Sequence, residues 1–414
     1  MRYSLLTMAA LLCTLTACHK DKHEKEKVPD TQSVLVYVAG DNNLTSRYNF
    51  FELDLKQMIE GSKNVSAGNN LLCFVDVYGQ RPYLMKVENG DTLRVHTFKE
   101  EMKSSDPATL QTAMNWMKEN YPALSYGLVL WGHADGWIIW EQTAASRQRR
   151  AYGQDKTGGE QWMNIPDMAR TLETFCQGQP LRFIFADCCC FQCVETDYEL
   201  RNVTDCIIAS AAEIPGEGAP YETVVPALFS QRTDFYQLVC DAYFEQVCEV
   251  EKLVAQYTKY QEPLSVVKTS AMEPLAQATK QALKQTFEPI DSEGNGYPNV
   301  SGLIYYYDQT LFDMNDVLQR FATPEVYNEW KQAFDQAVVY KTYTPVWMSN
   351  GHVPYLDYLG TEFRDFQMTE ERYGGVSMFL PQNSEEKLKK RENTTISQMQ
   401  WYAAVGLQEL GWGK

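Results

Sequence analysis

Positive charge, long apolar runs and nucleotide-binding loops are all scarce in this chain of 414 residues. The 37 Lys and Arg residues are outnumbered by 54 Asp and Glu residues, and a net charge of −17 disfavours binding to nucleic acid, which is also negative. Beyond the first 17 residues no run of about eighteen apolar residues occurs, so no membrane span is expected there. Neither a Gly-rich phosphate loop nor a GxSxG nucleophile motif is present. The apolar share of 44% excludes wholesale disorder and predicts a globular protein.

Histidine is also rare, which limits the choice of a catalytic base to five positions. His19 and His23 lie in a charged N-terminal segment, and His96 lies within a predicted strand, where a structural role is favoured. His352 lies in a loop and stays open as a candidate base. His133 directly follows an apolar run and lies between glycine and aromatic residues, which makes it the favoured candidate.

The N-terminus predicts a lipoprotein signal peptide over residues 1–17, with a positive charge at Arg2 and an apolar run over 5–15. The sequence Leu-Thr-Ala-Cys that follows resembles the lipobox of bacterial lipoproteins, in which Cys18 accepts the lipid. An ordinary secretory signal is the alternative. Residues 18–32 are charged, with almost no apolar residue, and predict a solvated tether. We therefore expect a lipid-anchored protein of the cell envelope that faces an extracytoplasmic space, at the outer membrane.

Nine of the eleven cysteines remain once the two in residues 1–18 are set aside, and an odd number leaves at least one free thiol. Cys73 and Cys206 lie in apolar runs and are predicted to be buried. Three consecutive cysteines at 188–190, with Cys193 close behind, need another explanation. Zinc binding and redox chemistry are alternatives. However, neighbouring side chains of an extended chain point to opposite sides, so three consecutive cysteines cannot all face one metal.

Apolar runs typical of strands alternate with helical patterns in the first half of the chain. We predict helices from residue 107 and over 165–175, and strands over 34–38, 71–77, 92–98, 127–131, 181–186 and 206–211. This alternation indicates an α/β fold with a mostly parallel sheet flanked by helices on both faces. In such sheets, active sites form beyond the carboxyl ends of the strands, where both His133 and the cysteine run lie.

The pattern changes from about residue 226. Helical spacing dominates to about 285, and we further predict strands over 301–307 and 375–380 and helices over 311–321 and 395–407. The expected division of the chain is a signal peptide, a tether, a catalytic region and a largely helical C-terminal region that packs on the catalytic core, over residues 1–17, 18–32, 33–225 and 226–414.

A thiol beside an imidazole is an arrangement for nucleophilic catalysis, because the thiolate attacks while the imidazole takes and returns the proton. His133 and the cysteine run at 188–190 end two predicted strands of one sheet. The sequence therefore favours a catalytic Cys-His pair at this edge.

These residues resemble the clostripain family of cysteine peptidases, in the clan that also holds caspases, legumains and gingipains. The matching segments occur in the family's order and span most of residues 33–381: VYVAGDNNL (36–44), LVLWGHADGW (128–137), AYGQD (151–155), FADCCCFQCVETDYELRNVTD (185–205), ASAAEIPGEGAPY (209–221) and GVSMFLP (375–381). The resemblance implies a caspase-like fold and an endopeptidase that cleaves after Arg or Lys.

The resemblance also selects residues. The family's pattern is Asp-Ala-Cys-Leu-Met, followed by Val-Glu and Tyr-Glu-Leu, which match the segment 194–200 here. Aligning on that segment implies Cys189 as the nucleophile, with Cys188 as the alternative, and His133 carries over as the catalytic histidine. The oxyanion hole is implied at the backbone N–H groups of Cys189 and Ala134, although the family usually has glycine at the second position.

Substrate preference and activation follow from the same resemblance. A pocket for a basic side chain needs acidic residues, and Asp187 and Glu217 are the candidates, with a solvated turn as the alternative role for Glu217. Family zymogens are cut between the two catalytic blocks, so autoprocessing is expected after Arg149 or Arg150, before Ala151. Calcium dependence is implied without identified ligands, and the chemistry itself requires no cofactor. The expected partner is a peptide or protein with a basic residue.

A different class of function stays open. A catalytically weak or inactive family member could bind peptide or glycan ligands, and the departures at Cys188 and Ala134 favour this alternative. An aromatic share of 13%, with 25 Tyr and 9 Trp, would suit ligand stacking.

Overall fold

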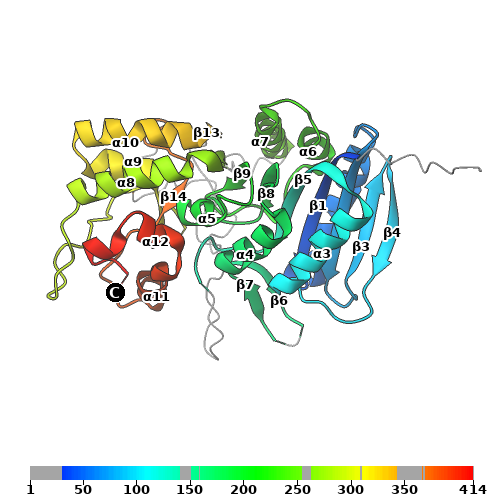
Figure 1. Ribbon diagram of the computed structural model, residues 1–414, viewed down its shortest axis with the longest axis horizontal. Coiled ribbons are helices and arrows are strands. Elements are labelled where there is room, and N and C mark those ends of the chain that lie inside the picture. The colour runs from blue at the N-terminus through cyan, green and yellow to red at the C-terminus, as the bar shows by residue number, and fades with distance from the viewer. Residues whose placement is uncertain are drawn as a thin grey trace, which may run out of the picture.

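A computed structural model describes residues 30–139, 151–157, 159–253, 263–307, 310–342, 366 and 369–413. A nine-stranded mixed sheet forms the centre of the molecule (Figure 1). Its five middle strands are parallel, and two antiparallel strands extend each edge. The order across the sheet is β13 (Val338–Lys341), β10 (Leu264–Lys268), β9 (Cys206–Ser210), β8 (Phe183–Asp187), β5 (Ala123–Gly132), β1 (Asp30–Gly40), β2 (Asn69–Val77), β3 (Tyr83–Glu88) and β4 (Asp91–Thr97).

The alternation of side chains along β1 divides the core into two layers. Leu35 and Tyr37 pack into the layer on one face, and Val34 and Val36 pack into the layer on the other. The Leu35 face is covered by α3 (Pro107–Asn120), α4 (Ile165–Cys176) and α5 (Val194–Glu199). The Val34 face is covered by α2 (Phe50–Ser62), α6 (Tyr221–Leu228) and α7 (Phe235–Leu253). Both faces of the sheet are therefore buried, as a parallel sheet requires.

The C-terminal half adds a second assembly beside β10 and β13 (Figure 1). It contains the helices α8 (Met272–Thr286), α9 (Met314–Phe321), α10 (Pro324–Ala337), α11 (Lys387–Thr395) and α12 (Gln400–Ala404). A small sheet lies among them, formed by β11 (Tyr305–Tyr307), β12 (Thr310–Asp313) and β14 (Ser377–Met378). Two further short elements lie near the strand ends of the large sheet, the helix α1 (Asn43–Ser46) and a hairpin of β6 (Tyr152–Asp155) and β7 (Gln161–Met163).

The predicted fold class is confirmed: the sheet is mostly parallel in its middle and has helices on both faces. The predicted helix start at Pro107 is also confirmed, and the Asp106 side chain caps it by accepting a hydrogen bond from the backbone N–H of Ala108. Cys73 and Cys206 are buried, as predicted.

Three details of the C-terminal half differ from the sequence predictions. β10 lies inside a stretch predicted to be helical, because a buried run of five residues carries no clear periodicity. The helix predicted over 311–321 begins only at Met314, after β12, where Asp313 caps it. The helix predicted over 395–407 is broken into 3-10 turns around α12. The predicted division at residue 226 stays a prediction, but β10 and β13 beyond it are strands of the central sheet.

Candidate active site

The register of two parallel strands brings His133 and Cys189 to one edge of the sheet. Trp131 of β5 pairs with Asp187 of β8, and His133 and Cys189 each lie two residues beyond that pair. Neighbouring strands lie about 4.8 Å apart, so the two loops that follow these strands start side by side. Both residues were predicted to follow strand ends, and the register places them at the same distance beyond one pair of strand residues.

The loop that carries His133, residues 132–137, is fixed by the chain that follows it. Gly132 has φ +144°, and a Cβ there would lie 2.7 Å from a backbone oxygen of β1, so only glycine fits without a shift. The N–H of Gly153 donates to the carbonyl of His133 at 2.8 Å, and the N–H of Asp135 donates to the carbonyl of Ala151 at 3.1 Å. Residues 151–153 therefore support this histidine loop.

The His133 side chain is half-buried and has a defined partner. Its Nε2 lies 2.9 Å from Oδ1 of Asn43, at the start of α1. Because the amide oxygen only accepts, the neutral imidazole donates from Nε2–H and keeps the lone pair of Nδ1 available to take a proton. Burial, together with the charge of Lys156, lowers the pKa of His133 to about 4, so the imidazole is neutral at neutral pH. These properties fit a general base.

Among the clustered thiols, Cys189 is the accessible one. Its side chain is half-buried, whereas Cys188, Cys190 and Cys193 are at most 1% exposed. Burial raises the pKa of the Cys188 and Cys193 thiols well above the ordinary value, which keeps them protonated and inert. The N–H of Ile214 donates to the Cys189 sulfur at 3.4 Å, and the Cys189 thiol lies 3.8 Å from the Ile214 carbonyl oxygen, so the backbone of Ile214 holds this side chain.

The loop that carries Cys189, residues 188–193, is fixed from both sides. Cys190 has φ +53°, an uncommon value for a residue with a side chain. Its N–H donates to the carbonyl of Ala212 at 2.8 Å, and the N–H of Gln192 donates to the carbonyl of Ser210 at 3.0 Å. On the other side, the N–H of Ser377 donates to the carbonyl of Gln192 at 3.1 Å. This cysteine loop therefore depends on contacts with distant parts of the chain.

The two backbone N–H groups implied as an oxyanion hole lie at the starts of these two loops. Ala134 is not among the described residues with positive φ, so an alanine is tolerated where the family usually has glycine. It forms a bridge with Tyr152 in which the flanking residues make the hydrogen bonds, and no acceptor for the Ala134 N–H occurs among the described residues. The bridge itself therefore leaves the Ala134 N–H unused.

The two acidic residues expected at a substrate pocket differ in burial. Asp187 is only 3% exposed, and its carboxylate accepts hydrogen bonds from the Ala219 N–H at 3.1 Å, the Tyr221 hydroxyl at 2.7 Å and the Tyr243 hydroxyl at 3.3 Å. Burial raises the pKa of Asp187 to about 6, although these hydrogen bonds lower it. Glu217 is exposed on the loop that leads to Ala219.

A third carboxylate, Asp54 of α2, was missed by the sequence reasoning. Its Oδ2 accepts a hydrogen bond from Trp131 Nε1 at 2.6 Å, while its Oδ1 is buried and has no hydrogen-bond partner among the described residues. A Cβ on Gly218 would lie 2.9 Å from an Asp187 oxygen and 3.3 Å from Asp54 Oδ2, so both carboxylates lie against this glycine. Burial and then the charge of Asp187 raise the pKa of Asp54 to about 9.

The signals for the missed residues were weak. Asp54 lies on the buried stripe of α2 with Phe51 and Met58, so a carboxylate at an apolar helical position was the available sign. Asn43 follows the turn after β1, and nothing in its local sequence separates it from the neighbouring Asn42, whose side chain caps α1.

Other predicted residues fall outside this site. Cys18, Arg149, Arg150 and His352 lie outside the described residues. Ala151 is fully buried beside the histidine loop. His96 packs on aromatic rings at the sheet edge, in agreement with a structural role.

The described part of the chain offers no evidence for a metal or a membrane span. The eight cysteines described there are free thiols. No group of three or more His, Cys, Asp or Glu side chains in that part could hold a metal ion. None of its helices combines the length and the apolar character needed to cross a bilayer.

Comparisons with known proteins identify the family of the chain. The family model described as the clostripain family matches residues 36–412. A secreted C11 cysteine protease from Bacteroides thetaiotaomicron, solved with an irreversible peptide inhibitor, is 27% identical with a TM-score of 0.72, and the match covers 91% of this chain and 99% of that one. An inactive zymogen C11 protease from Parabacteroides distasonis is 25% identical with a TM-score of 0.68, over 91% and 99%.

A second secreted C11 cysteine protease from Bacteroides thetaiotaomicron, at 19% identity and a TM-score of 0.70 over 91% of this chain and 100% of that one, shows the same fold. No curated protein matches significantly. The fold and these likenesses define a cysteine peptidase. More specifically, the chain belongs to the clostripain family, since the family model covers most of its length.

Proposed function

We propose that this peptidase cleaves peptide bonds after Arg or Lys with Cys189 as nucleophile and His133 as general base and acid. Two observations support this proposal. Both loops follow the paired residues Trp131 and Asp187, and Cys189 is the accessible thiol among buried ones. Neutral His133 takes the thiol proton, and the sulfur attacks the carbonyl carbon of the residue before the scissile bond. The imidazolium then protonates the leaving amine.

Hydrolysis of the thioester completes the cycle. Water gives a proton to His133 while its oxygen attacks the thioester carbonyl, and the thiol leaves with that proton. In both halves the carbonyl oxygen becomes negative, and the N–H groups of Ala134 and Cys189 are the proposed donors to it. Asn43 holds the imidazole with Nδ1 unprotonated and acts as a positioning residue.

The preference for a basic residue is supported by acidic groups beside the nucleophile. Asp187 lies two residues before Cys189, and Glu217 lies on the loop that also carries Gly218, which touches the Asp187 carboxylate. A guanidinium or ammonium group entering there would meet negative charge on a protein whose net charge is −17. Asp54 lies against the same glycine, but its pKa of about 9 keeps it protonated at neutral pH, so it adds no negative charge there.

We further propose that the mature protein is anchored by a lipid on Cys18 and faces an extracytoplasmic space at the outer membrane. The lipobox-like sequence and the charged residues 18–32 support this. Two of the similar peptidases are described as secreted.

Activation by a cut after Arg149 or Arg150 is part of the proposal, supported by the run of three arginines between the two catalytic blocks and by a relative described as an inactive zymogen. Calcium dependence stays a prediction. The described residues do not present a calcium site, and no step above uses calcium.

Cleavage of reporter peptides tests the proposal. Purified protein should hydrolyse peptides with Arg or Lys before the reporter group, leave a matched Glu peptide intact, and lose activity when alkylated with a peptidyl inhibitor that ends in Arg. Binding of the Arg peptide without hydrolysis, by both native and alkylated protein, would favour the alternative of an inactive lipoprotein that binds peptide or glycan. Equal cleavage of the Glu peptide would contradict the acidic pocket.

A further inference from the structure

The outer side of the cysteine loop is supported by a segment from near the C-terminus. The N–H of Ser377 in β14 donates to the carbonyl of Gln192 at 3.1 Å, and its hydroxyl lies 3.3 Å from the same oxygen. Cys193 and Ser377 form a parallel bridge. Just beyond, the N–H of Phe379 donates to the buried Glu195 carboxylate at 2.8 Å. The position of β14 therefore decides where the cysteine loop ends.

Asp313 at the end of β12 fixes the chain that leads into β14. Its Oδ2 accepts hydrogen bonds from the N–H groups of Gly374 at 2.7 Å and Gly375 at 3.1 Å, and from the Tyr306 hydroxyl at 2.5 Å. Its Oδ1 accepts from the N–H of Asp316 and caps α9. One buried side chain thus joins the helix start to the incoming strand.

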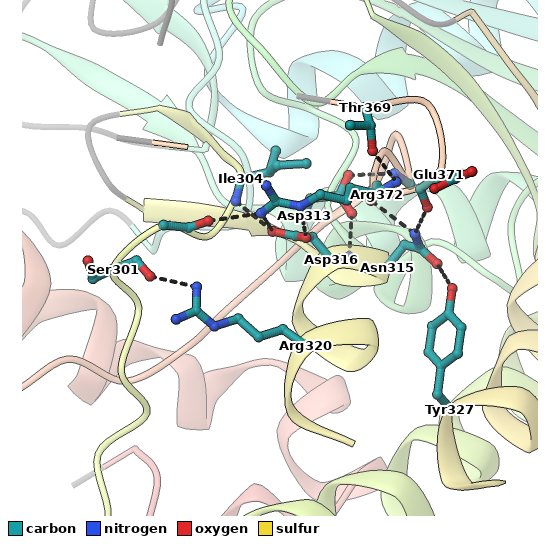
Figure 2. Close-up of polar contacts among 12 residues, drawn as sticks. Ser301, Ile304, Asp313, Asn315, Asp316, Arg320, Tyr327, Thr369, Glu371 and Arg372 are labelled. Atoms are coloured by element: carbon teal, nitrogen blue, oxygen red, sulfur yellow. Dashed lines mark hydrogen bonds and ion pairs between the residues drawn. The ribbon is translucent and has the colours of Figure 1, made fainter. Parts of the chain in front are cut away.

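The first turn of α9 adds two more contacts, which Figure 2 shows around Arg372. The Arg372 guanidinium donates to both oxygens of Asp316, at 2.6 and 2.7 Å, in a bidentate ion pair. Asn315 Nδ2 donates to the carbonyls of Glu371 at 3.0 Å and Arg372 at 2.9 Å. Asp313, Asn315 and Asp316 are at most 2% exposed.

A second set of contacts ties the same segment to the large sheet. Ser265 of β10 donates its hydroxyl to the carbonyl of Gly375 at 2.7 Å, and Lys341 of β13 donates to the carbonyl of Tyr373. In addition, β12 pairs directly with β14, with Asp313 opposite Ser377. The support of the cysteine loop is therefore continuous from α9 through residues 371–377.

We propose that Asp313, Asp316 and Arg372 are positioning residues that set the orientation of the Cys189 thiol through β14. The inference rests on the proposed function, in which Cys189 is the nucleophile. Cys190 adopts φ +53°, so the loop keeps this shape only while its neighbours impose it. Displacement of a reacting atom by about 1 Å costs on the order of 100-fold in rate, so loosening β14 reaches the chemistry although no residue of the network touches substrate.

The test compares variants on one helix and its partner segment. Arg372→Met removes the bidentate pair, Arg372→Lys keeps the charge without the fork, and Arg320→Met is the matched control. Arg320 lies on α9, like Asp316, but its guanidinium donates to the Ser301 carbonyl and not to residues 371–377 (Figure 2). Values of kcat, KM and thermal midpoint are measured for an Arg reporter peptide well below the melting temperature.

We expect kcat to fall at least tenfold in Arg372→Met and about threefold in Arg372→Lys, with KM within about twofold of the parent, because the acidic pocket is untouched. Arg320→Met should keep the parental kcat. Across these variants, the rate at which a small thiol reagent alkylates Cys189 should fall in parallel with kcat.

Parental kcat in a folded Arg372→Met protein would overturn the inference. If Arg372→Met does not fold, the test uses Arg372→Lys, and an unchanged kcat in that variant would likewise overturn the inference. Cleavage by Cys189→Ala would instead overturn the proposed function, so the two failures are distinguishable.

Discussion

The histidine loop and the cysteine loop begin side by side at the same edge of the sheet, yet the supports of their backbones differ in how distant they are in the sequence. The histidine loop is bonded to residues 151–153, a short distance further along the chain. The cysteine loop is bonded to the end of β9 and to Ser377, which is 185 residues away from Gln192. The backbone of the histidine loop is therefore held by nearby chain, whereas the backbone of the cysteine loop also needs a remote segment. The His133 side chain has a remote partner of its own in Asn43, 90 residues away.

This difference determines where each catalytic group is vulnerable. Local support forms with the neighbouring chain, whereas remote support requires the C-terminal half to dock first, since closing a long loop costs entropy before its contacts form. Changes in the C-terminal half should therefore reach the thiol, and changes near residue 151 should reach the imidazole.

The largest effect should come from the nucleophile itself. Cys189→Ala removes the attacking sulfur and should lower kcat at least about 1,000-fold, because loss of a nucleophile removes the whole catalytic unit. Cys188→Ala should retain most of the activity, since Cys188 is fully buried. Steady-state rates on an Arg reporter peptide measure both. A dead Cys188→Ala protein beside an active Cys189→Ala protein would shift the assignment by one residue and break the comparison.

The next largest effect should come from the acidic residues of the proposed substrate site. Asp187→Asn should lower kcat/KM for Arg peptides by about 30-fold or more, because losing one partner of a buried charge pair costs about 2–5 kcal/mol. Glu217→Gln, which changes an exposed carboxylate, is expected to cost about tenfold, or roughly 1.4 kcal/mol.

The pH profile separates Asp187 from His133. Burial raises the pKa of Asp187 to about 6, so under the proposed function its carboxylate should attract a basic side chain above that pH and lose this attraction below it. The pKa of His133 is lower, about 4, so its protonation does not limit the rate until more acid pH. We expect kcat/KM for Arg peptides to fall as pH drops through about 6 in the parent. The same limb in Asp187→Asn would show that another group is responsible and would contradict the role given to Asp187.

A smaller effect should follow from removing the partner of the base. Asn43→Ala should lower kcat about tenfold, because the imidazole loses the partner that fixes its tautomer. This loss is smaller than the roughly 100-fold to 10,000-fold that general acid–base catalysis contributes. Asn43→Asp places a negative charge beside the imidazole and should raise the pKa of His133 above its value of about 4. The acidic limb of kcat then moves upward. Unchanged kcat in both variants would mean that residues 151–153 position the base without Asn43.

The same contrast explains what the sequence could and could not reveal. β1, β5, β8 and β9 correspond to apolar runs, so their positions and the placement of His133 and Cys189 at strand ends could be predicted locally. Asn43 and Asp54 could not, because their roles exist only through contacts with His133 and Trp131, which belong to other elements. The support of the cysteine loop by β14 was hidden for the same reason.

Cutting the chain before Ala151 should change thermal stability only slightly, although this cut is proposed to activate the peptidase. A cut after Arg149 or Arg150 breaks neither the hydrogen bond from the Asp135 N–H to the Ala151 carbonyl nor that from the Gly153 N–H to the His133 carbonyl, and both of these bonds join the two fragments across the cut. The two fragments also share the large sheet, since β5 and β8 lie on opposite sides of the cut and pair with each other. The nicked protein should stay associated and melt within a few degrees of the intact chain, where about 1 kcal/mol corresponds to roughly 2–4 °C in a domain of this size. Mass spectrometry under denaturing conditions identifies the cut, and size-exclusion chromatography with a thermal melt tests the association. The Cys189→Ala protein, which cannot cut itself, is the intact control. Dissociation of the fragments would show that the histidine loop depends on covalent continuity through residue 150 rather than on the hydrogen bonds of residues 151–153.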